Sequence, residues 1–177
     1  MVVKLTDGRE AVRAYVSGHA AQGVDHVTAL VRDDRDSMRA LIDDLSEAEG
    51  NVSVAPEEWS ISQALQHMNS SFDRSIHRLI FLSTGRPFEW PAAAGGLSEG
   101  QPPTFSEARR AFLQGEQAVL DILEHMGEGS NLDVTYEHAF FGPFSWLQWA
   151  VYSHHVHTHD HLGQVGEARK LVLSQRR

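Results

Sequence analysis

Apolar residues recur at intervals of three and four along most of the chain, the spacing that collects side chains on one face of an α-helix. The longest of these patterns cover residues 24–48, 60–83 and 106–126, the last with Ser106 as its N-terminal cap. A fourth pattern covers residues 144–173. Four helices of this length predict an all-α fold, a four-helix bundle.

The connections between these helices differ in kind. Gly50 and Pro56 separate the first two helices, since glycine ends helices and proline cannot continue one. Residues 84–105 are rich in proline and glycine and predict a long loop between helices 2 and 3, long enough to arch over one end of the bundle as a lid. Residues 130–144 alternate in polarity and are expected to be extended, whereas residues 1–22 form an N-terminal extension or a short helix.

Composition and charge narrow the class of protein. The 177 residues are 41% hydrophobic and 22% charged, which fits one domain spanning residues 1–177. A net charge of −9 argues against nucleic acid and anionic membranes as partners, because both are bound through dense Lys and Arg. We find no apolar run suited to a signal peptide or a membrane span, and expect a cytoplasmic protein.

The chain has no cysteine, so a metal ion would have to use imidazole or carboxylate ligands. Residues 151–165 hold five of the 11 histidines. With about 100° per residue, and Trp146 placed at the centre of the buried face, His157 and His161 point inward. Two imidazoles on adjacent turns can bind a divalent cation if a third ligand arrives from another helix.

The other histidines of this segment are expected to play lesser parts. His155 and His159 fall in the most polar sector of the helix and are expected to face solvent. His154 lies between the two directions, and either touches the site from behind its ligands or is hydrogen-bonded at the edge of the bundle.

The third ligand is suggested by His67, at the edge of the apolar face of the second helix. The small residues Ala64 and Ser71 beside it leave room for a ring and an ion. A lone histidine in such a place can also be a purely structural residue.

The order and spacing of these residues resemble a known family. The match consists of a Trp-Ser pair followed by histidine (Trp59, Ser60, His67), a lead-in segment (EHAFFGPFSWLQW, with His138 and Gly142), and an H-x3-H-x2-Q pattern (His157, His161, Gln164). Together they resemble the DinB/YfiT-like superfamily of metal-dependent enzymes over residues 24–168. The resemblance implies a bundle in which His67, His157 and His161 are the metal ligands. Relatives with assigned activities resemble thiol-dependent S-transferases or isomerases, others are called hydrolases, and many pair as homodimers.

The sequence thus predicts a divalent metal, Zn²⁺ or Ni²⁺, held by three histidines with an open position that activates a low-molecular-weight thiol, as in an S-transferase. The alternatives are a hydrolase that uses metal-bound water and a bundle that binds metal without catalysis. In either enzyme the substrate would be a small molecule.

Four further residues are candidates for the surroundings of the metal. Gln164 would hydrogen-bond a ligand or water, or simply pack as an amide, and His154 would lie behind the ligands. His138 would lie at the mouth of the site, or cap the turn into the last helix. Trp59 would line a pocket, or pack beneath the start of the second helix.

Overall fold

The computed structural model describes residues 1–53, 55, 58–86, 104–125, 131 and 133–176. Of Phe72 and Asp73 only the backbone is described. The lid expected within residues 84–105 therefore falls largely outside the described residues, as does the expected end of the third helix at Met126.

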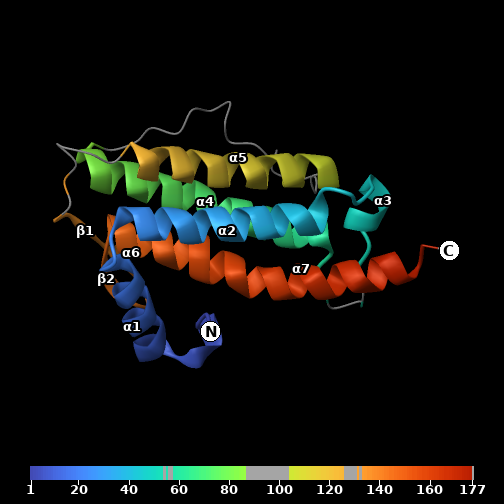
Figure 1. The fold of residues 1–177 in the computed structure, drawn as a ribbon, viewed down its shortest axis with the longest axis horizontal. Coiled ribbons are helices and arrows are strands. Elements are labelled where there is room, and N and C mark those ends of the chain that lie inside the picture. Colours follow the sequence, from blue (N-terminus) through green and yellow to red (C-terminus); the bar gives the residue numbers. More distant parts are fainter. Residues whose placement is uncertain (54, 56–57, 87–103, 126–130, 132, 177) are drawn as a thin grey trace.

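Four long helical segments form a bundle, which confirms the all-α prediction (Figure 1). They are α2 (Val24–Ile42), α4 (Ile61–Thr84), α5 (Phe105–Glu124) and a final composite segment of α6 (Trp146–Ala150), η2 (Val151–Val156) and α7 (His157–Ser174). Helices α2 and α7 run in one direction and α4 and α5 in the other. Since α5 contacts α2 and α4, and α7 also contacts both, the order around the bundle is α2, α5, α4, α7. The α4/α7 face therefore lies opposite the α2/α5 face.

The N-terminal residues do form a short helix. A single turn η1 (Leu5–Asp7) leads into α1 (Arg9–Ala20), and Gly18 lies inside that helix without interrupting it. Gly23, with φ of 93°, starts the next helix, α2. Helix α1 lies against α2, α6 and η2, so it covers part of the final segment that the sequence left open to solvent.

Local capping decides where the helices begin, and it corrects two predicted boundaries. The first long helix ends at Ile42 rather than at residue 48, because Ser46 caps the separate short helix α3 (Glu47–Gly50). The third helix is capped by Thr104, not Ser106: the Thr104 hydroxyl accepts the Glu107 N–H, and the Glu107 carboxylate accepts the Thr104 N–H. Ser106 instead donates to Glu47 at 2.8 Å. That bond ties α3 to the start of α5.

The connection before the last helix is an antiparallel hairpin of β1 (Thr135–His138) and β2 (Gly142–Ser145), with Tyr136 opposite Phe144. Two strands therefore form within the segment that was expected to be extended, and the second ends one residue past the predicted end at residue 144. The helix starts after Ser145, whose hydroxyl accepts the Gln148 N–H, rather than at residue 144.

Segment η2 is one turn of π-helix within the last helix, which the sequence did not predict. Its mark is the backbone N–H of His157, which donates to the Tyr152 carbonyl five residues back. After this wider turn the buried line of α7 passes through Thr158, Val165 and Val172. His157 and His161 therefore lie half-buried at the edge of the bundle that faces α4, not on its central line.

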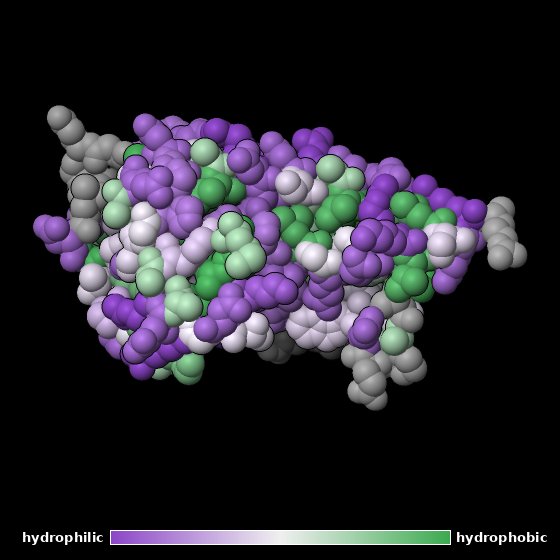
Figure 2. Space-filling view, turned by 60° about the horizontal axis from the view of Figure 1, so that its bottom comes forward, coloured by the Kyte–Doolittle hydropathy of each residue, from purple (hydrophilic) through white to green (hydrophobic). Residues whose placement is uncertain are grey.

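The surface is predominantly hydrophilic on the face shown in Figure 2, with hydrophobic residues between polar ones, as suits a net charge of −9. Among the described residues, the core contains two apolar clusters. One surrounds Trp149 and Phe144 near the hairpin, and the other surrounds Met38 and Phe112 toward the opposite end. Among the described residues, no helix combines the length and apolarity needed to cross a membrane.

Candidate metal centre

Three histidines from two helices meet at the α4/α7 face. His67 lies on α4, and His157 and His161 lie one turn apart on α7. The Nε2 atom of His157 is 3.2 Å from the Nε2 atom of His67 and 3.2 Å from that of His161. One nitrogen from each ring lies within 4.8 Å of the other two. The structure thus brings together the three residues that the sequence singled out.

Burial favours the neutral form of two of the three rings, His157 and His67. Burial, and then the neighbouring His161 and His67, lower the pKa of His157 to about 3. Burial and His161 also lower the pKa of His67. Since only neutral imidazole carries a lone pair for a metal, His157 is a ready ligand at neutral pH.

Gln164 determines which nitrogen of His161 is available. Its Oε1 atom lies 2.8 Å from Nδ1 of His161. An amide oxygen can only accept, so Nδ1 carries the proton and Nε2 keeps its lone pair toward the cluster. Gln164 is exposed to solvent and not packed in the core, so this hydrogen bond is its main interaction in the structure.

Two of the three spacings between the nitrogens match those around a small divalent cation. Ligand nitrogens about 2.05 Å from a tetrahedral Zn²⁺ lie about 3.3 Å from one another. The two Nε2 distances of 3.2 Å are close to that value. Three neutral imidazoles also form a donor set that Zn²⁺ and Ni²⁺ accept.

Trp59 covers one side of the cluster. Its ring centroid lies 4.8 Å from that of His67 and 6.2 Å from that of His161, with the latter rings nearly parallel. The residue is 41% exposed, so it does not pack beneath the start of α4. Trp59 forms part of the rim of the site.

A pocket of about 300 Å³ leads from His67 and His157 along α4 toward the hairpin. His138 lines it, at the end away from the histidine cluster. The Nδ1 atom of His138 accepts the N–H groups of Phe140 and Phe141, each at 3.1 Å. His138 therefore stabilises the hairpin turn and also contributes to the pocket wall.

The expectation that His155 faces solvent is wrong. His155 is 4% exposed; its Nδ1 atom lies 2.5 Å from the Asp34 carboxylate and its Nε2 atom 2.8 Å from the Tyr15 hydroxyl. The Asp34 carboxylate also lies 3.3 Å from Nδ1 of His159, whose side chain stays 46% exposed. Helix α1 lies over this polar side of the last helix and brings Tyr15 to His155. The packing of α1 therefore explains why His155 is buried.

His154 is not at the bundle edge. It is fully buried, and its Nδ1 atom lies 3.4 Å from the carboxylate of Glu116 on α5, which also accepts from Thr158 at 3.2 Å. Burial raises the pKa of Glu116. His154 is also the smallest of the causes that lower the pKa of His157. The influence of His154 on the cluster is therefore electrostatic.

Sequence reasoning missed the partners of these two histidines. Asp34 follows Val27 and Val31 and precedes Met38 on the buried stripe of α2, and Glu116 follows Phe112 by one turn on α5. A carboxylate within an apolar stripe needs a buried partner, so both positions carried a usable signal.

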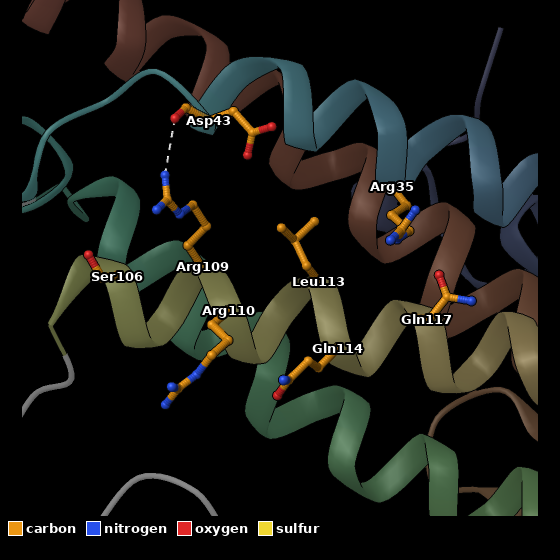
Figure 3. A pocket seen from close by; sticks show the side chains of 8 residues that line it. All are labelled: Arg35, Asp43, Ser106, Arg109, Arg110, Leu113, Gln114 and Gln117. Atoms are coloured by element: carbon orange, nitrogen blue, oxygen red, sulfur yellow. Dashed lines mark hydrogen bonds between the residues drawn. The ribbon is translucent and has the colours of Figure 1, made fainter.

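A second pocket, of about 690 Å³, lies between α2 and α5, on the face opposite the histidine cluster. Figure 3 shows Arg109 reaching across it to the Asp43 carbonyl oxygen, at 3.1 Å. None of its described lining residues is a histidine. Asp43 is the single carboxylate in that described lining, so this groove does not gather the several ligands that hold a transition metal.

A comparison with protein families gives a match that covers both helices of the cluster. The model described as the DinB superfamily matches residues 30–165, which include His67, His157 and His161. No curated protein matches the chain.

Proposed function

The chain belongs to the DinB superfamily, and from this membership together with its three-histidine cluster we propose that it is a metal-dependent enzyme. His67, His157 and His161 would hold one divalent cation, Zn²⁺ or Ni²⁺. The reaction we favour is the transfer of a small-molecule thiol to a small-molecule substrate.

The observation that carries the proposal is the convergence of three imidazole nitrogens beside a pocket. Three protein ligands are the usual number for a catalytic metal, whereas structural sites commonly have four. No fourth histidine or carboxylate joins the cluster among the described residues. The pocket along α4 begins at His67 and His157, so a substrate there would reach the remaining position.

When bound, a divalent cation would lower the pKa of a coordinated thiol or water molecule and supply a nucleophile at neutral pH. The protein's own groups prepare the site. Burial keeps His157 neutral, Gln164 fixes the orientation of His161, and Trp59 limits access of water from one side. Since the chain has no cysteine, a thiol would have to come from a cosubstrate.

The first test is the metal content of protein purified without an affinity tag. We expect close to one equivalent in the wild type and little in His67→Ala, His157→Ala and His161→Ala. His125→Ala, which changes an exposed histidine at the end of α5, is the matched control and should keep its metal. Full retention by all three cluster variants would refute the ligand assignment.

The second test concerns the reaction. In Co²⁺-substituted protein, an added thiol that binds the metal should produce thiolate-to-cobalt absorption. Turnover that requires an added thiol supports transfer, whereas turnover without one indicates hydrolysis. A metal spectrum that responds to neither thiols nor small anions would indicate a site that binds metal without catalysis.

A further inference from the structure

The pocket beside the histidine cluster carries two arginines. Arg74 and Arg78 lie on α4, on the same side as His67, and both line the pocket. With about 1.5 Å of rise per residue, their Cα atoms lie about 10 Å and about 16 Å along the helix from that of His67. The positive charge is therefore placed at the end of the pocket away from the ligands.

Among the described residues, no acidic side chain pairs with these two arginines. The described lining of the pocket contains no carboxylate, and neither arginine forms an ion pair with any described residue. The chain as a whole has a net charge of −9. Positive charge in a pocket whose described lining holds no carboxylate attracts anions, even in an acidic protein.

Arg78 is held ready for such a ligand. Its guanidinium carbon lies 4.3 Å from the ring centroid of Trp149 and 5.4 Å from that of Tyr136. Stacking uses the face of the guanidinium and leaves its N–H edge free for a bidentate contact with a carboxylate or similar oxyanion. Burial and then the positive charge of Arg78 lower the pKa of His138, and the same charge partly offsets the burial that raises the pKa of Tyr152.

We propose that Arg74 and Arg78 bind the anionic end of a small organic anion whose other end reaches the three-histidine cluster. The substrate class is then an extended molecule with a metal-binding group at one end and a carboxylate or comparable oxyanion at the other. This inference rests on the proposed function for the metal end, whereas the anion end depends only on the arginines.

The groove on the opposite face is less suited to this role, although it also holds arginines. Arg35 pairs with Asp36 at 3.3 Å, and Arg109 donates to the Asp43 carbonyl. Its exposed Arg110 provides a matched control, an arginine on a comparable helix surface but far from the histidine cluster.

The test compares 6-mercaptohexanoate with the uncharged 6-mercaptohexan-1-ol on Co²⁺-loaded protein, with thiolate-to-cobalt absorption as the measure of binding. We expect the anionic thiol to bind about tenfold more tightly. Arg74→Gln and Arg78→Gln should remove most of this preference and leave binding of the neutral thiol within about twofold, since one charge-assisted contact is lost in each. Arg110→Gln should change neither.

A second measurement does not need the metal. In metal-free protein, the arginine Nε–H signals of Arg74 and Arg78, assigned by their loss in the two variants, should shift when 6-mercaptohexanoate is added. Equal affinities of the two thiols, with no shift of these signals, would overturn the inference and leave the metal site standing. Shifted arginine signals without any thiol absorption would support the anion site and contradict the proposed function instead.

Discussion

Acidification should destabilise the metal-free protein through His157. The pKa of this ring is about 3 in the folded protein, against an ordinary value of 6.5 that we take for the unfolded chain. Between these two values the unfolded chain binds the proton and the folded protein does not, so folding becomes less favourable as the pH falls. Lowering the pH from about 7.5 to about 5 should therefore reduce the free energy of unfolding by about 2 kcal/mol through this one ring. The lowered pKa of His67 also makes the folded protein less stable as the pH falls.

The assay is urea unfolding of metal-free wild type and His157→Gln at both pH values. On going from the higher to the lower pH, the free energy of unfolding of the wild type should fall by about 2 kcal/mol more than that of the variant. This corresponds to about 4–8 °C in the melting temperature. His125→Gln, at an exposed histidine, should follow the wild type. If wild type and His157→Gln lose the same amount of stability, the argument that burial holds His157 neutral is wrong.

Three further substitutions test the packing and the site. Gly50→Ala should lower the free energy of unfolding by about 1–3 kcal/mol in chemical denaturation, because the added Cβ would lie 2.1 Å from the buried ring of Phe105. Gly166→Ala, where a Cβ meets nothing within 4 Å, should instead stabilise α7 by about 0.5–1 kcal/mol, and a loss would contradict this account. Gln164→Leu should weaken metal binding about 10–100-fold in competition with a chelator, because His161 loses the partner of its Nδ1 proton; unchanged affinity would exclude that orienting role.

The sequence predicted the fold well because its signals are local. The three-and-four spacing identified all four bundle helices, and the family pattern pointed to the histidines that the structure brings together. Boundaries failed where two caps competed. Both Thr104 and Ser106 are suitable N-terminal residues, and only the reciprocal bonds with Glu107 distinguish them.

The surroundings of the site could not be deduced in the same way, because they depend on contacts between distant segments. His155 looked exposed on its own helix, but α1 lies over it and brings Tyr15 within hydrogen-bonding distance. The sequence of α4 alone does not show that Arg74 and Arg78 border a pocket, because the other wall of that pocket, with Trp149, comes from the last helix. Neither arrangement has a signature within one helix.

The π-turn η2 sets the angular offset between the two halves of the last helix. Trp149 lies before it, in the apolar core, whereas His157 and His161 of the candidate metal centre follow it directly. The wider turn takes up one residue more than a regular α-helical turn, so winding the same residues as a regular α-helix would turn everything downstream by about 100°. The direction in which His157 and His161 face His67 thus depends on the winding of a segment that supplies none of the proposed ligands.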